Sequence, residues 1–96
     1  MRGGWVYIMA NRYRGALYTG VSANLPARIH AHLEGRGSIY VQERGLLRLV
    51  WAESFPTIDE AITFEKRLKR WHRPWKFDLI ERANPGWEDL CPKLLG

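Results

Sequence analysis

Glu65 is the residue whose chemistry fits its position least well. The segment around it carries apolar residues at helical spacing: Ile58, Ala61, Ile62, Phe64, Leu68 and Trp71. With about 100° of rotation per residue, Glu65 falls in the middle of that apolar arc. A buried carboxylate is costly unless it is paired or bound to a cation. The pattern therefore indicates a salt bridge to an arginine, an escape at the edge of the stripe, or a bound cation.

Arg28 and His32 are a second set of residues that could do chemistry. They lie four residues apart in a predicted helix, so both are expected to project from one face. The buried stripe of this helix is predicted to be a separate one, formed by Leu25, Ile29 and Leu33. An Arg–His pair on a helix surface is ordinarily solvated. A role in a functional site is the alternative, and the pair by itself does not decide between the two.

Tyr7 and Tyr18 lie in two apolar runs, Trp5 to Ala10 and Ala16 to Val21, separated by the polar insert Asn11 to Gly15. Runs rich in Val, Ile and aromatic residues on either side of a glycine-containing connection predict a β-hairpin. The hairpin would bring the two tyrosines near each other on paired strands. Paired tyrosines of this kind are usually packing residues, so the hairpin by itself does not identify a site.

Two further segments carry side chains suited to contacting phosphates. Residues 35–45 contain glycines at both ends and predict a loop that presents Arg36, Ser38, Tyr40 and Arg44. Residues 66–76 interleave cations with two tryptophans, and the cations expected to contact a nucleic acid are Lys66, Lys69, Arg70, Arg73 and Lys76. The first segment could equally be a plain surface connection. In the second, basic residues at a helix C-terminus also complement the macrodipole, so phosphate binding is one of two explanations.

The apolar runs and caps between these residues predict the elements that position them. A helix is expected from Leu25 to about Glu34, because Asn24 can cap its N–H groups and Pro26 is tolerated in its first turn. Gly35 would end it. The strongly apolar run Leu46 to Phe55 predicts a third strand, central in the sheet or well covered.

The C-terminal half is expected to be helical. Thr57 with a glutamate three residues later is a capping-box pattern that opens the helix carrying Glu65. Pro74 should break or kink that helix, and a second short helix is predicted from Trp75 to about Ala83. Residues 84–90 predict a turn followed by a packing segment, which Trp87 would pin to the body.

Composition limits the classes of protein that fit the chain. The 96 residues make one domain, with a core over about residues 5–90 supplied by five Trp, four Tyr and three Phe. Fifteen Lys and Arg against ten Asp and Glu give a net charge of +5, which favours polyanionic partners or leaves a merely solvated basic surface.

Cys91 is the sole cysteine, so a disulfide framework and a thiolate-rich metal site are excluded. No apolar run approaches the ~18 residues of a membrane span, and no signal-peptide pattern opens the chain. We therefore expect a cytoplasmic protein without a membrane partner, and the oligomeric state is left open.

The order of the unusual residues resembles the GIY-YIG nuclease superfamily, which includes the N-terminal nuclease module of excinuclease C. The ordered set is Tyr7, Tyr18, Arg28, His32, Glu65 and Asn84. The first half-motif stands here as Val6-Tyr7-Ile8 and the second as Tyr18-Thr19-Gly20, so both tyrosines and the second glycine are retained. The resemblance spans Trp5 to about Leu90 and is strongest to small stand-alone bacterial members.

The resemblance implies a function and assigns roles within it. Glu65 would be the metal ligand, Arg28 the phosphate-binding arginine, and His32 the histidine that some members carry one turn later. Asn84 matches a polar residue that several of these nucleases use near the C-terminus. The implied activity is a Mg²⁺- or Mn²⁺-dependent endonuclease that hydrolyses phosphodiester bonds in DNA, in DNA repair or processing. The alternative is a non-catalytic nucleic-acid-binding module that retains the fold.

The general base is left open among Tyr7, Tyr18 and His32. The resemblance favours a tyrosine, with Tyr7 slightly ahead. Free tyrosine has a pKa of about 10, so a tyrosine base needs its phenolate stabilised by the metal or by Arg28. The pKa argument by itself favours His32, which titrates near neutrality.

These elements together predict a small α/β (α+β) fold in the order β-β-α-β-α-α. Three strands would form a mainly antiparallel sheet flanked by helices, since the short hairpin makes its two strands antiparallel neighbours. The position of the third strand, beside the first or beside the second, is left open.

Overall fold

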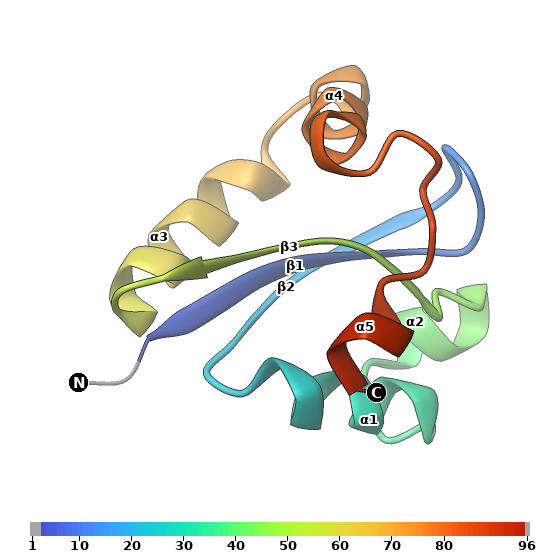
Figure 1. The fold of residues 1–96 in the computed structure, drawn as a ribbon, viewed down its shortest axis with the longest axis horizontal. Coiled ribbons are helices and arrows are strands. Elements are labelled where there is room, and N and C mark those ends of the chain that lie inside the picture. Colours follow the sequence, from blue (N-terminus) through green and yellow to red (C-terminus); the bar gives the residue numbers. More distant parts are fainter. Residues whose placement is uncertain (1–2, 96) are drawn as a thin grey trace.

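A three-stranded antiparallel sheet is the middle layer of the structure, a computed structural model that describes residues 3–95 (Figure 1). Its strands are β1 (Gly4–Ala10), β2 (Leu17–Ser22) and β3 (Arg48–Phe55), in the order β2-β1-β3. The predicted hairpin and the mixed α/β fold are thus confirmed. The third strand lies beside the first, a position that the sequence left open, and β1 is the central strand. Of the two predicted possibilities for the third strand, a central position is wrong, and good coverage holds only for its first half.

The helices of residues 3–95 cover the two faces of this sheet (Figure 1). One face carries α1 (Leu25–Leu33), α2 (Ile39–Arg44) and α5 (Cys91–Leu95). The other face carries α3 (Ile58–Lys69) and α4 (Arg73–Ala83). The observed order β-β-α-α-β-α-α-α contains the predicted one and adds two short helices. No helix in this described part of the chain combines the length and the apolar character that crossing a membrane requires.

The short helix α2 lies where a loop was predicted, so that prediction is corrected. Ser38 caps it by accepting a hydrogen bond from the backbone N–H of Tyr40, at 3.2 Å. Gly45 ends it in the left-handed conformation, at φ 64°. Three glycines in eleven residues suggested a loop, but Gly35 and Gly37 precede the helix and Gly45 is its C-cap.

The two longer predicted helices begin at the expected caps. The side chain of Asn24 accepts from the backbone N–H of Ala27 at 3.2 Å. The side chain of Thr57 accepts from the backbone N–H of Glu60 at 3.1 Å, as a capping box requires. Pro74 lies in the first turn of α4, where its missing N–H leaves no helical bond unmade. The two cap predictions depended on local chemistry and are confirmed. The break between the helices comes earlier than predicted, because α3 ends at Lys69 and α4 begins at Arg73 rather than at Trp75.

The alternation of side chains along β1 divides the core into two parts. Val6, Ile8 and Ala10 point toward α3 and α4, where they pack with residues such as Leu68 and Trp87. Tyr7 and Met9 point the other way, where they pack with α1, α2 and α5 through Leu25, Ile29, Val41 and Cys91. Every residue of β1 from Val6 to Ala10 is 0% exposed. The central strand therefore separates two chemically different faces.

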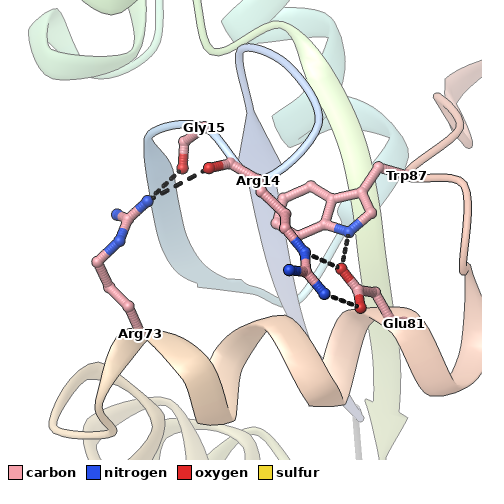
Figure 2. Close-up of polar contacts among 5 residues, drawn as sticks. All are labelled: Arg14, Gly15, Arg73, Glu81 and Trp87. Atoms are coloured by element: carbon pink, nitrogen blue, oxygen red, sulfur yellow. Dashed lines mark hydrogen bonds and ion pairs between the residues drawn. The ribbon is translucent and has the colours of Figure 1, made fainter.

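The hairpin connection is fastened to α4 by a polar network (Figure 2). Arg14 donates two hydrogen bonds to the Glu81 carboxylate, each 2.8 Å, and the indole N–H of Trp87 donates to the same carboxylate at 2.7 Å. Arg73 donates to the backbone oxygen of Gly15 at 2.9 Å. The bonds from Arg14 and Trp87 lower the pKa of Glu81 to about 2. The network orients the hairpin and holds down the C-terminal turn, and Trp87 is buried as predicted.

Candidate active site

Tyr7 and Tyr18 share the sheet face that α1 covers. Tyr7 pairs with Gly20 across the hairpin and Met9 pairs with Tyr18, so the two tyrosines are diagonal neighbours with ring centroids 6.3 Å apart. A Cβ atom at Gly20 would lie 2.5 Å from both Cζ and the hydroxyl oxygen of Tyr7. The Tyr7 ring therefore lies directly over Gly20. This contact is the physical reason for a glycine in the second half-motif.

His32 joins these tyrosines from α1. Its Nε2 atom lies 2.9 Å from the hydroxyl oxygen of Tyr7, and its ring centroid lies 5.6 Å from that of Tyr18. The imidazole is 1% exposed, and its Nδ1 atom has no hydrogen-bond partner among the residues described. The backbone of Gly37 closes over Nδ1, because a Cβ atom there would lie 2.1 Å from it. His32 is a buried member of the cluster rather than a solvated surface residue.

The burial of His32 corrects the predicted stripe of α1. Leu25 and Ile29 are buried as expected, but Leu33 is 41% exposed. With about 100° per residue, His32 falls between the directions of Leu25 and Arg28, whereas Leu33 is rotated away from the sheet. The helical angles in the sequence already place His32 on the buried face of α1. The apolar side chain of Leu33 led to its assignment to that face instead.

Arg28 is the exposed cation of the cluster. Its guanidinium interacts with the Tyr7 hydroxyl and, more weakly, with Tyr18, and the interaction with Tyr7 raises the pKa of Arg28. Burial raises the pKa of Tyr7 to about 12, although Arg28 acts in the opposite direction. Burial, together with the charge of Arg28, lowers the pKa of His32. At neutral pH the cluster therefore holds a protonated phenol, a neutral imidazole and a permanent positive charge.

Tyr40 of α2 extends the cluster toward solvent. Its ring centroid lies 6.2 Å from that of Tyr18, and the guanidinium of Arg44 lies 4.7 Å above the Tyr40 ring. Arg36 pairs with the exposed carboxylate of Glu34. Ser38 is used as the cap of α2. Of the four residues that were expected to contact phosphates here, Tyr40 is the one that touches the tyrosine and histidine cluster.

Glu65 lies in α3, which packs against β1 and β2 from the opposite face of the sheet (Figure 1). It is 8% exposed, and one carboxylate oxygen is 2.7 Å from Nζ of Lys69. The misfit carboxylate is thus paired, with a lysine of its own helix rather than with an arginine. Within residues 3–95, no hydrogen bond or ion pair joins Glu65 to the cluster of Tyr7, Tyr18 and His32.

Asn84 lies on the β3 side of the molecule. Its amide nitrogen donates to the backbone oxygens of Val50, at 3.0 Å, and Glu88, at 2.8 Å. Its amide oxygen accepts from the backbone N–H of Glu88 at 3.0 Å. The side chain is 6% exposed and both of its polar atoms are in use. Asn84 is therefore a brace that ties the C-terminal turn to β3, and its hydrogen bonds reach main-chain atoms rather than another candidate residue.

The cations of residues 66–76 divide into two groups. Lys69 is bound to Glu65, Arg73 is bound to the hairpin connection, and Lys76 is partly buried. Burial, and then the charges of Arg73 and Lys69, lower the pKa of Lys76. Lys66, on α3, and Arg70, the C-cap residue of that helix, are exposed. The segment is crowded with positive charge, but only part of it faces solvent freely.

A metal ion would find one protein carboxylate at Glu65 and no preformed cage. In the described part of the chain, no group of three or more His, Cys, Asp or Glu side chains is placed to hold an ion. Mg²⁺ characteristically accepts one or two carboxylates and completes its shell with water and substrate phosphate oxygens. The buried, hard oxygen donors of Glu65 fit that preference, and the exposed lysine beside them is a partner that an ion can displace.

Three comparisons with known proteins give consistent matches. A family model described as the GIY-YIG catalytic domain matches residues 3–78. A UPF0213 protein of Halalkalibacterium halodurans is 33% identical over 85 residues, which cover 88% of this chain and 89% of that protein. A UPF0213 protein of Staphylococcus haemolyticus is 36% identical over 77 residues, or 80% of this chain and 93% of that one. The solution NMR structure of a UPF0213 protein from Bacillus halodurans aligns with a TM-score of 0.57 at 32% identity, covering 91% of this chain and 92% of that chain.

Proposed function

Since the chain belongs to the GIY-YIG catalytic domain family and groups with the UPF0213 proteins, we propose that it is a metal-dependent endonuclease that hydrolyses phosphodiester bonds in DNA. DNA repair or processing would supply such substrates. The resemblance inferred from the sequence is confirmed at the level of the family. The observation that carries the proposal is the cluster in which Tyr7 bonds to His32 beside Tyr18 and the exposed Arg28.

Arg28 is the group that we assign to the phosphate. It is exposed, it is positively charged at every accessible pH, and its guanidinium lies beside two phenols. A guanidinium presents several N–H donors in a fixed plane, which matches phosphate oxygens. The same charge would offset the negative charge that builds up on the phosphorane-like transition state.

The bond between Tyr7 and His32 allows two of the three candidate bases to act together. A phenol with a pKa of about 12 cannot ionise by itself at neutral pH. As Tyr7 accepts a proton from the attacking water, it can pass its own hydroxyl proton to Nε2 of His32, which lies 2.9 Å away. No phenolate then has to accumulate. Tyr18 is the more exposed of the two tyrosines, and we assign it to orienting the water and the phosphate.

Glu65 is the residue that would hold Mg²⁺ or Mn²⁺. When bound, the ion would polarise the scissile phosphate and stabilise the leaving 3′-oxygen. Lys69 would have to release the carboxylate for this to occur, and it would then be free to contact a phosphate itself. Asn84 is assigned to holding the C-terminal turn, because its amide atoms are already bonded to the main chain.

Cleavage assays on DNA and RNA, with Mg²⁺ or Mn²⁺ and with EDTA as the blank, test this function. Arg28→Ala and Glu65→Gln should each abolish metal-dependent cleavage in a protein that remains folded. Arg12→Ala removes an exposed arginine from the hairpin connection, outside the cluster, and should cleave like the wild type. Binding without cleavage under every condition would instead support the non-catalytic module. Cleavage that survives either site substitution would contradict the proposed site.

A further inference from the structure

Trp75 is an indole that the fold leaves open to solvent. It is 58% exposed, whereas Trp51 and Trp87 are 5% and 0% exposed. It lies in the first turn of α4, directly after Pro74. A large aromatic side chain that is exposed contributes little to the packing of the fold, and such residues commonly mark contact sites.

A cleft of about 300 Å³ opens beside this indole, between the end of α3 and α4. It is lined by Trp71, Trp75, Asp78, Leu79 and Arg82. The rings of Trp71 and His72 stand at 81° and 85° to that of Trp75, at 6.3 and 5.6 Å. Among residues 3–95, therefore, no aromatic ring lies stacked in parallel on Trp75. The cleft has an aromatic wall and, at Asp78 and Arg82, a polar edge.

The surroundings of the cleft are strongly positive. A groove of about 280 Å³ at the C-terminal end of α3 is lined by Lys66, Arg67 and Arg70, together with Thr63. Arg70 directly precedes Trp71, which lines the cleft. Lys76 and Arg73 lie at the start of α4, on the same side of the sheet. An aromatic surface bordered by exposed cations suits a ligand with flat rings and a polyanionic backbone, since the rings stack and the anionic groups are neutralised.

We propose that the α3–α4 cleft is a base-stacking subsite for single-stranded nucleic acid, in which an unpaired base stacks on Trp75 and the cations of α3 hold the flanking phosphates. The inference rests on the proposed nuclease function and adds the form of the substrate. The helices beside the subsite, α3 and α4, lie on the face of the sheet opposite α1 (Figure 1), and none of the residues that line it belongs to the cluster around Tyr7. A base-paired duplex keeps its bases stacked on one another and offers Trp75 no free face.

Equilibrium binding in EDTA, where no cleavage occurs, tests the subsite. The full-length protein and Trp75→Ala are titrated with labelled oligonucleotides of equal length: an intact single strand as DNA and as RNA, the corresponding abasic strand, and a duplex. Trp75→Ala should weaken binding of the intact single strand by about 5- to 150-fold, the loss expected for one base–aromatic stack. Binding of the abasic strand and of the duplex should not change. The DNA and RNA arms show which sugar the subsite accepts.

Matched variants separate stacking from charge. Tyr13→Ala removes a 52% exposed aromatic from the hairpin connection, outside the cleft, and should bind like the wild type. Trp75→Phe should retain most of the affinity, because a smaller ring can still stack. Arg70→Ala should weaken binding to all the ligands and reduce the slope of log K against log salt by about 0.7–0.9, the value for one phosphate contact.

An equal loss on intact and abasic strands, or no loss at all, overturns the inference. Should Trp75→Ala fail to fold, acrylamide quenching of the wild-type fluorescence replaces it: the intact strand must protect the exposed indole and the abasic strand must not. Because no step involves cleavage, a failed stacking test leaves the nuclease proposal standing. If the protein stacks a base but cleaves no substrate, the nuclease proposal is contradicted and the base-stacking subsite is still supported.

Discussion

The hydroxyl oxygen of Tyr7 lies 2.9 Å from Nε2 of His32, although 25 residues separate the two in the chain. Tyr7 is on the central strand and His32 is on α1, and both are almost completely buried. A buried tyrosine hydroxyl needs a hydrogen-bond partner, and this histidine supplies it. The pair thereby joins two residues that the sequence offered as rival bases.

Tyr7 and His32 should lose activity as one unit. Tyr7→Phe and His32→Gln should each lower the single-turnover rate of cleavage by about 10²- to 10⁴-fold, the range for general acid–base groups. The double variant should be no slower than the slower single variant, because both changes interrupt one proton transfer. Glutamine can still accept the Tyr7 hydrogen bond but cannot take up its proton. A His32→Gln rate close to that of the wild type would therefore reduce His32 to a positioning residue.

His32 should make the stability of the protein depend on pH. Burial lowers its pKa in the folded state below the ordinary value of about 6.5. In the unfolded chain the imidazole takes up a proton first as the pH falls, so protonation favours unfolding. The stabilisation is fully present above the unfolded pKa and is lost as the pH falls toward the folded pKa. Urea unfolding between pH ~7.5 and ~5 should show this loss in the wild type, and the extra slope should be absent in His32→Gln.

Gly20→Ala tests the contact between the hairpin and the Tyr7 ring. The added Cβ would lie 2.5 Å from the ring of a residue that is 0% exposed, so the ring cannot move aside freely. Overpacking of this kind costs about 1–3 kcal/mol, and the displaced hydroxyl should also lose activity. Gly86→Ala is the control, because its Cβ would meet nothing closer than 3.7 Å. Equal thermal unfolding of the two variants would contradict the close approach.

Asn84→Ala should separate bracing from catalysis. The change leaves the carbonyls of Val50 and Glu88 without their donors and should destabilise the protein by about 1–3 kcal/mol, since buried polar groups lose their partners. The cleavage rate of the protein that remains folded should stay within a few-fold of the wild type. The measurements are denaturant unfolding and single-turnover cleavage below the melting transition. A large loss of rate with unchanged stability would restore Asn84 to the catalytic machinery.

What the sequence determined by itself was local in origin. The caps at Asn24 and Thr57 were predicted correctly because a cap is a contact between residues three apart. The hairpin of β1 and β2 followed from alternation and a glycine-containing connection. The conflict at Glu65 followed from helical angles, and the carboxylate is indeed buried and paired. In each case the deciding interaction lies within one element or one turn.

Only the tertiary structure decided how these elements are combined. The place of β3 beside β1, the burial of His32 in place of Leu33, and the use of Asn84 as a brace all depend on partners that are distant in the chain. Packing of one element on another selects among faces that are equivalent in the sequence. It also sets α3, the helix that carries Glu65, and α1, the helix that carries Arg28 and His32, on opposite faces of the sheet, an arrangement that no spacing along the chain encodes (Figure 1).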